Sequence, residues 1–285
     1  MKLLRVGAIG QERPAALDAQ GRLVDLSDLV AEIDGAFLSG DGVEAVRSAL
    51  EGGQLPLVTD PAPRIGAPIA RPGKVVCIGL NYSDHAAETG AQPPAEPILF
   101  LKAPNTVVGP DDQVLLPRRS VKTDWEVELA VVLGRTARYL DTDEAALACV
   151  AGYAISNDLS EREFQLERGG QWDKGKSCET FNPLGPWLVT ADEVPDPQQL
   201  GLRLSVNGTR RQNGNTRTMI FGVAGVIRYV SQFMVLEPGD VINTGTPAGV
   251  ALGQPEPKPY LRRGDVIELE IDGLGAQRQT VQEAA

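Results

Sequence analysis

Residues 124–133 read Asp-Trp-Glu-Val-Glu-Leu-Ala-Val-Val-Leu, and this stretch predicts the centre of the fold. Successive side chains of a β-strand point to opposite faces of the sheet. Every second residue from Val127 to Leu133 therefore contributes to one apolar face, which is typical of a strand packed on a core. Glu126 and Glu128 fall on the other face, about 6–7 Å apart along the backbone.

The pairing of Glu126 with Glu128 indicates either a metal site or a solvated acidic face. Two neighbouring carboxylates repel each other, and a hard cation that accepts an oxygen from each would remove the repulsion. Charged side chains mostly lie at the surface, however, and Glu268 and Glu270 show the same spacing in another predicted strand. We expect this second pair to be solvated, because it lies in a polar C-terminal hairpin. Spacing alone does not separate the two pairs, so a third ligand is needed.

Asp158 is the candidate for that third ligand. It ends an apolar run, residues 152–158, and Arg162 and Gln165 follow it by four and seven positions. A helical turn that begins at Asp158 would place all three side chains on one face. The alternative is a helix N-cap with an ion pair between Asp158 and Arg162.

The remaining patterns predict a mostly β (α+β) protein with few, peripheral helices. Residues 1–52 are typical of a small α/β unit, and residues 54–73 hold five prolines, which is typical of a linker. We therefore divide the chain into a small N-terminal domain with its linker, residues 1–70, and a catalytic domain, residues 71–285. Strands are expected at residues 3–9, 74–78, 98–102, 126–133, 241–244 and 266–271, hairpins at 15–26 and at 202–213 around Asn207-Gly208, and helices at 42–50, 142–151, 161–167 and 225–233.

Composition excludes several classes of partner. The 285 residues carry a net charge of −11 without a Lys/Arg stripe, so we expect no nucleic-acid partner. No apolar run approaches the ~20 residues of a membrane span, and the start of the chain does not resemble a signal peptide. The three cysteines are too scattered for a disulfide framework or a zinc site, which favours a reducing, cytoplasmic location.

Six motifs occur in an order that closely resembles the fumarylacetoacetate hydrolase family. In chain order they are residues 79–88, residues 100–110, the pair Glu126/Glu128, the segment Asp158/Arg162/Gln165, the dipeptide Lys176-Ser177 and residues 245–250, which read Gly-Thr-Pro-Ala-Gly-Val. The resemblance implies a mixed, rolled β-sheet, usually in a homodimer, and a Mg²⁺ or Mn²⁺ ion. Glu126, Glu128 and Asp158 are the implied metal ligands. Together with the proline-rich linker, the resemblance suggests the bacterial members of the family that act on sugar-derived 2,4-diketo acids.

For the reaction, the resemblance implies hydrolysis of a carbon–carbon bond in a small anionic 2-oxo acid. An acylpyruvate or a 2,4-diketo-3-deoxy sugar acid would give pyruvate and a second carboxylic acid. Arg162 and Lys176 would balance the charge of the substrate, Gln165 would orient a substrate oxygen, and Thr246 would donate a hydrogen bond to the substrate carboxylate. On its own, Lys176 reads as a solvated loop lysine. Trp172 and Trp187 flank this stretch, and we expect them to pack in the core or in loops.

His85 is the only histidine of the chain, so any imidazole chemistry depends on it. His85 and Glu88 lie three apart in a predicted helical turn between Ser83 and Gly90. Alone, this is an exposed ion pair on a surface turn. The resemblance implies instead a hinged lid, on which His85 is a general base oriented by Glu88.

Two alternatives stay open. A lyase, decarboxylase, hydratase or isomerase would use the same metal site on oxaloacetate, ureidoglycolate or a 2-hydroxydienoate. A non-catalytic protein that binds a sugar acid or a metal is the second alternative, and release of pyruvate in the presence of metal would exclude it.

Overall fold

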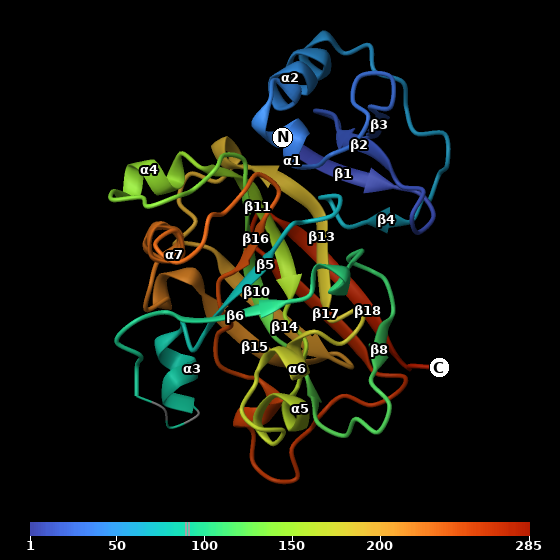
Figure 1. Ribbon diagram of the computed structural model, residues 1–285. Helices are drawn as coiled ribbons and strands as arrows, with labels where there is room; N and C mark the ends of the chain where they lie inside the picture. Colours follow the sequence, from blue (N-terminus) through green and yellow to red (C-terminus); the bar gives the residue numbers. More distant parts are fainter. Residues whose placement is uncertain (89, 91) are drawn as a thin grey trace.

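The structure is a computed structural model that describes residues 1–88, 90 and 92–285. A large mixed sheet forms one layer of the fold, and a five-stranded sheet packs against it (Figure 1). The described helices are short and lie around the two sheets. None of them is both long and apolar enough to span a membrane.

The large sheet has 11 strands and contains the predicted central strand. In order across the sheet they are β3 (Leu23–Asp25), β2 (Arg13–Leu17), β1 (Lys2–Val6), β13 (Asn182–Thr190), β11 (Val150–Asn157), β10 (Val127–Leu133), β16 (Val241–Asn243), β5 (Val75–Gly79) and β6 (Ile98–Lys102), with β4 (Ile65–Gly66) beside β1 and β7 (Val107–Val108) beside β13. Its pairs β16–β5 and β13–β7 are parallel and the others are antiparallel, which confirms the mostly β fold with a mixed sheet.

The smaller sheet holds the C-terminal hairpin. Its strands are, in order, β15 (Thr209–Asn215), β14 (Gly201–Val206), β17 (Val266–Ile271), β18 (Gly275–Glu283) and β8 (Val114–Leu116), while β9 (Thr123–Asp124) and β12 (Ser160–Glu161) form a separate pair. The predicted hairpin turn is confirmed, because Asn207 and Gly208 both have positive φ angles, 51° and 75°.

The described residues also contain seven α-helices and four short 3₁₀ helices. They are α1 (Gly35–Ser39), α2 (Gly42–Gly52), α3 (Ser83–Glu88), α4 (Asp143–Leu147), α5 (Arg162–Leu166), α6 (Asp173–Lys176) and α7 (Val223–Val230), with η1 (Pro104–Thr106), η2 (Ala191–Glu193), η3 (Thr216–Thr218) and η4 (Ala251–Gly253).

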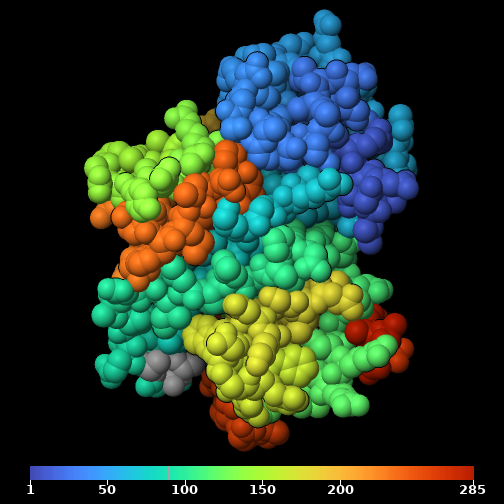
Figure 2. All heavy atoms as spheres, in the orientation of Figure 1, coloured from blue at the N-terminus to red at the C-terminus, as the bar shows by residue number. Residues whose placement is uncertain are grey.

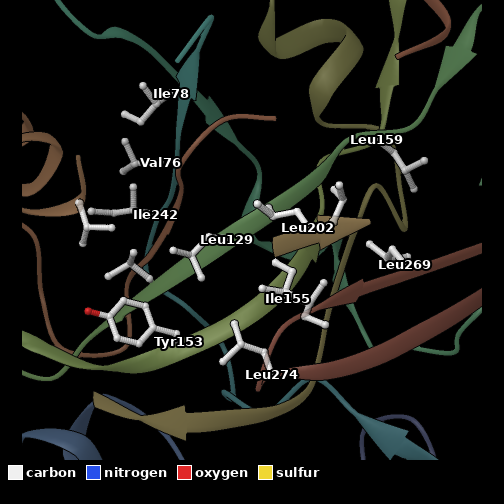
Figure 3. Packing of buried hydrophobic residues seen from close by; sticks show 14 of the residues in the cluster. Val76, Ile78, Leu129, Tyr153, Ile155, Leu159, Leu202, Ile242, Leu269 and Leu274 are labelled. Carbon is white, nitrogen blue, oxygen red and sulfur yellow. The ribbon is translucent and has the colours of Figure 1, made fainter. Parts of the chain in front are cut away.

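Strand β10 lies at the centre of the core and is buried along its whole length. Its predicted apolar face, with Leu129, packs toward Ile155 of β11 and Leu202 of β14 (Figure 3). The opposite face continues beyond the glutamates as Ala130 and Val132, which pack against a second cluster beneath the N-terminal helices. Both faces of β10 are therefore covered, so the glutamates at its start cannot reach bulk solvent freely.

The N-terminal strands extend the large sheet. Residues Lys2 and Leu3 of β1 pair with Val189 and Leu188 of β13. Strand β4 lies within the proline-rich segment that we predicted as a linker, and it pairs with β1. The N-terminal residues, in blue, form one end of the molecule in Figures 1 and 2. The division of the chain at residue 70 stays a prediction.

Two of the differences from the sequence-based expectation concern the centre of the large sheet. The helix expected over residues 142–151 ends at Leu147, and the chain enters β11 at Val150, where β-branched and apolar side chains suit a central strand. Strand β13 was not predicted, because Pro183 and Pro186 argue against a sheet interior. Its register with β11 shifts between the pairs Tyr153–Val189 and Ile155–Gly185, so Pro186 lies where the regular ladder is interrupted.

Candidate active site

The strand pair β10–β11 brings the three predicted metal ligands together. Glu126 directly precedes β10, Glu128 lies within it, and Asp158 directly follows β11. The antiparallel register pairs Val127 with Asn157, and the Asp158 backbone N–H donates to the Glu126 carbonyl at 2.9 Å. One carboxylate oxygen from each of the three residues lies within 4.8 Å of the others, and all three residues are buried.

The other glutamate pair behaves as expected for solvated groups. The side chains of Glu268 and Glu270 are 52% and 47% exposed, and each faces an arginine of a neighbouring strand, Arg278 and Arg203 respectively. Burial therefore separates the two Glu-x-Glu pairs where spacing could not.

Burial and mutual repulsion dominate the electrostatics of the three carboxylates. Burial, followed by the charges of Asp158 and Glu126, raises the pKa of Glu128 well above its ordinary value, although the Gly245 N–H donates to it at 2.8 Å. Burial acts in the same direction on Glu126, but Lys176 and Arg162 outweigh it and lower the pKa of Glu126 to about 2.

Three buried cations surround the carboxylates. Lys176 Nζ lies 2.6 Å from a Glu126 oxygen and 2.8 Å from an Asp158 oxygen. Arg162 donates to Glu126 at 2.6 Å and to Asp124 at 2.8 Å. Lys102 Nζ pairs with the second oxygen of Asp158 and donates to the Leu159 carbonyl at 3.0 Å. These contacts hold the carboxylates in place, so the acidic cluster is preorganised by its own cations.

The donor set fits a hard divalent cation. Ligand oxygens bind Mg²⁺ or Ca²⁺-sized ions at about 2.0–2.6 Å, so oxygens on opposite sides of one ion lie about 4–5 Å apart. The triad meets this limit. Asp124 and the triad, set against Lys102, Arg162 and Lys176, leave a net charge of −1 when all are ionised, and the buried carboxylate of Glu161 beside Arg162 would make it −2. A bound divalent cation would remove this negative charge, which would otherwise repel an anionic ligand.

Lys102 and Asp124 were not assigned a role from the sequence. Lys102 lies on the same face of β6 as the buried Phe100, and this alternation was the available signal for an inward-facing lysine. The Asp124 carboxylate accepts a hydrogen bond from the Arg162 guanidinium. It also accepts the backbone N–H groups of Ala251 at 2.7 Å and Leu252 at 3.0 Å. Asp124 thus fixes Arg162 to the loop that follows the Gly-Thr-Pro motif.

Gln165 and Thr246, which we predicted to bind substrate, both line the cavity described below. The Gln165 amide oxygen accepts from Arg162 at 3.0 Å. The Thr246 hydroxyl donates to the Val127 carbonyl at 2.9 Å and accepts from Gln212 at 2.8 Å. The hydroxyl hydrogen of Thr246 is therefore engaged within the protein, and its predicted donation to a substrate carboxylate would require this bond to break.

Helix α3 carries His85 and Glu88 to the edge of the carboxylate cluster. His85 is buried and lines the cavity, and its Nδ1 lies 3.4 Å from a Glu88 oxygen. Both Glu88 oxygens also accept the Gly249 N–H at 3.0 Å. A Cβ at Gly249 would lie 2.0 Å from the Arg211 carbonyl oxygen, and a Cβ at Gly253 would lie 2.4 Å from the Glu88 carboxyl carbon. Only glycines leave room for this docking of Glu88.

A cavity of about 230 Å³ joins these groups. Glu126, Glu128, Arg162, Gln165 and Lys176 line it, and Thr246 and His85 face it as well. Trp172 packs against the core, as expected, and its side chain also lines the cavity. Trp187 lies elsewhere, beside Gly275 and under the Lys2 ammonium group.

Comparisons with known proteins agree with this geometry. The family described as fumarylacetoacetate (FAA) hydrolase C-terminal matches residues 74–282. A Burkholderia ambifaria protein named as a hydrolase is 55% identical over 285 residues, with both chains fully covered. The structure of a fumarylacetoacetate hydrolase from Exiguobacterium antarcticum superposes with a TM-score of 0.88 at 38% identity, with both chains fully covered.

An isomerase has a similar structure. A 2-hydroxyhepta-2,4-diene-1,7-dioate isomerase from Mycobacterium marinum gives a TM-score of 0.75 at 31% identity, covering 100% of this chain and 99% of the other. The six motifs, the fold and the family match all agree, and the chain belongs to the fumarylacetoacetate hydrolase family of enzymes.

Proposed function

We propose that the enzyme hydrolyses the C3–C4 bond of a 2,4-dioxo acid to pyruvate and a second carboxylic acid. The observation that carries the proposal is the meeting of two groups at one cavity. A buried triad of carboxylates lies at one side, and a histidine–carboxylate pair lies at its edge. The triad provides a site for a divalent cation, Mg²⁺ or Mn²⁺, and the pair provides a base for water.

The positive groups of the site would bind the 2-oxo acid end of the substrate. A bound divalent cation would supply Lewis acidity toward the substrate oxo group. Arg162 and Lys176 lie beside the triad and carry charge opposite to that of the substrate carboxylate. Gln165, held by Arg162 at 3.0 Å, is placed to orient a substrate oxygen.

His85 would accept a proton from the attacking water. The water oxygen adds to C4, the C3–C4 bond breaks, and its electron pair leaves as the enolate of pyruvate. The imidazolium of His85 then returns the proton to C3, so that water is consumed and two carboxylic acids are formed. Glu88 would orient the ring, because its own carboxylate is fixed by the Gly249 N–H.

An isomerase acting on an unsaturated 2-oxo acid is the second candidate, favoured by the similar structure of the Mycobacterium marinum isomerase. It would use the same cation site but consume no water. Decarboxylation of oxaloacetate would also give pyruvate, with carbon dioxide as the second product.

One experiment separates these reactions. The protein, supplied with Mn²⁺, is incubated with an acylpyruvate in ¹⁸O-water, and the products are identified by mass. Hydrolysis predicts equal amounts of pyruvate and a second acid that carries ¹⁸O. Conversion of a dienoate substrate without loss of mass would support the isomerase instead, and release of carbon dioxide from oxaloacetate alone would support the decarboxylase. A homodimer, which the resemblance implied, stays part of the proposal and is tested by light scattering.

A further inference from the structure

We infer that the substrate carries an apolar arm, an alkyl or aryl acyl group, rather than a polyhydroxylated chain or a second carboxylate. This inference rests on the proposed function, because it takes the 2-oxo acid end of the substrate as bound at the carboxylate triad. The inference concerns the acyl arm of the substrate and the side chains that would contact this arm.

The lysine and the arginine that line the cavity, Lys176 and Arg162, are both already engaged in buried ion pairs. Arg162 is paired with Asp124 and Glu126, and Lys176 is paired with Glu126 and Asp158. Neither cation can turn toward a distant second carboxylate without leaving a buried carboxylate unpaired, which is costly.

Much of the remaining lining of the cavity is apolar. Its apolar side chains, which we call the apolar wall, are Ile78, Leu80, Phe100, Leu166, Trp172 and Leu252. Among the cavity-lining residues that the structure describes, this wall includes no charged side chain. It therefore offers no partner for an anionic arm.

Trp172 is held in this wall by the local fold. Its ring packs edge-on against Phe100, with 5.4 Å between the ring centroids. A Cβ at Gly79 would lie 2.6 Å from the Trp172 ring, so a glycine at that position of β5 leaves the space that the indole occupies.

The same short segment supplies a cation and an aromatic ring to the cavity. Trp172 caps α6, and Lys176 ends that helix one turn later. Lys176 Nζ lies 4.9 Å from the centre of the Phe100 ring, so the cation and the apolar wall meet at this ring. A substrate whose carboxylate lies near Lys176 would therefore extend its acyl arm along Phe100 toward Trp172.

This arrangement discriminates between classes of substrate. Burial of an apolar arm is favourable by about fourfold in affinity per methylene, the equivalent of about 0.8 kcal/mol. Hydroxyl groups of a sugar acid would lose their water there, and the indole N–H of Trp172 is the one side-chain donor among the six residues of this wall. A second carboxylate would lose more, because no cation faces it there.

A substrate series measures this directly. Acetyl-, butanoyl-, hexanoyl- and benzoylpyruvate are compared with fumarylpyruvate and with a 2,4-diketo-3-deoxy sugar acid. We expect kcat/KM to rise by up to about 16-fold for each two methylenes until the cavity is filled, and to be lowest for the dianion and the sugar acid. A higher kcat/KM for either of these two than for butanoylpyruvate would overturn the inference while leaving the proposed hydrolysis intact.

Binding of acids that cannot be cleaved keeps the test independent of the reaction. 2-Oxohexanoate and 2-oxoadipate have equal chain lengths and lack the 4-oxo group, so calorimetry in Mg²⁺ reports affinity alone. We expect 2-oxohexanoate to bind at least tenfold more tightly. If no dioxo acid is cleaved but this preference holds, the proposed reaction fails and the apolar arm stands; equal or reversed affinities would overturn the arm.

Two variants locate the preference. Trp172→Ala should abolish the gain with chain length. Leu166→Lys places a cation in the wall, and Leu166 is 44% exposed at the end of α5, so folding should tolerate it. It should shift the preference at least tenfold toward 2-oxoadipate. Leu147→Lys, at a residue 42% exposed at the end of α4 and outside the cavity lining, is the matched control and should change nothing. A wild-type preference in both Trp172→Ala and Leu166→Lys would contradict the assignment of this wall.

Discussion

Lys176 Nζ lies 2.6 Å from a Glu126 oxygen, so the residue predicted to bind substrate also holds the first predicted metal ligand in place. The same ammonium group lies 2.8 Å from Asp158. The carboxylate oxygens of Glu126 and Asp158 therefore serve both as predicted metal ligands and as partners of the Lys176 ammonium group, to which the substrate is also predicted to bind. A change in any member should be detected in both metal binding and protein stability.

Metal binding should depend on the buried glutamate pair and not on the exposed one. EDTA should abolish turnover, and Mg²⁺ or Mn²⁺ should restore it. Glu126→Ala should lose calorimetrically detectable Mn²⁺ binding, because it removes one of the three converging oxygens. Glu268→Ala is the control, since it removes the same side chain from a half-exposed position. Full activity of a metal-stripped Glu126→Ala protein would rule out this site.

The stability of the metal-free protein should fall as pH rises. Burial and the neighbouring carboxylates Asp158 and Glu126 raise the pKa of Glu128, with Lys176 and the Gly245 N–H opposing them. A raised folded-state pKa stabilises the fold below the unfolded value of about 4.3, and the stabilisation is lost as pH rises through the folded-state pKa. Glu126 does not offset this, because its lowered pKa, about 2, keeps it ionised above pH 5.

Urea unfolding in EDTA from pH 5 to pH 9 measures this effect for wild type and Glu128→Gln. The variant should lose the downward slope and should be the more stable of the two at high pH, because Gln remains neutral. Glu270→Gln, at a half-exposed position, should retain the wild-type slope. An identical slope in Glu128→Gln would show that another group titrates.

Removal of the Lys102 charge should destabilise the metal-free protein. Lys102 and Asp158 form a fully buried ion pair, and loss of one partner from such a pair typically costs about 3–5 kcal/mol. Lys102→Met should therefore lower the free energy of unfolding in EDTA by an amount of this order. Lys122→Met removes a lysine from an exposed pair with Glu167 and should cost less than about 1 kcal/mol. Similar losses in the two variants would contradict a structural role of Lys102.

The sequence predicts this site better than it predicts the sheet around it. Glu126, Glu128 and Asp158 could be predicted as the ligands of one site, because strand alternation and the order of the motifs are both visible in the sequence. Strand β13 could not, since its prolines oppose a strand and its register shift depends on β11, which is distant in sequence. The apolar run of β11 also lacks the alternation of a half-buried strand, because both of its faces are covered.

The residues that complete the site depend on tertiary structure. Lys102 is a single lysine in a short apolar strand, and only the approach of β11 gives it a partner in Asp158. Trp172 meets Phe100 and Gly79 across about 70 and 90 residues of chain, and nothing local distinguishes it from Trp187. The packing of Trp172 against the core was therefore expected, but its place in the cavity lining could not be predicted.

His85 should be the general base, and it should be dispensable for metal binding. Attack on C4 requires a deprotonated water, and imidazole is the side chain that most often serves as a general base. His85 lines the cavity beside Glu88 but is not one of the three converging metal ligands. His85→Ala should therefore lower kcat by roughly 10²–10⁴-fold with little change in Mn²⁺ affinity.

Glu88 should act through His85, which a double-mutant cycle can show. Glu88→Gln keeps an oxygen that can accept the Gly249 N–H but loses the negative charge that would stabilise the imidazolium, so it should lower kcat less than His85→Ala does. The double variant should lose no more than His85→Ala alone, because the two residues act as a unit. Rates across pH for wild type and His85→Ala, together with Mn²⁺ affinities, decide the matter. Near-wild-type kcat in His85→Ala would place the base elsewhere, and fully additive losses would show that Glu88 serves only to dock helix α3 on the glycine loop.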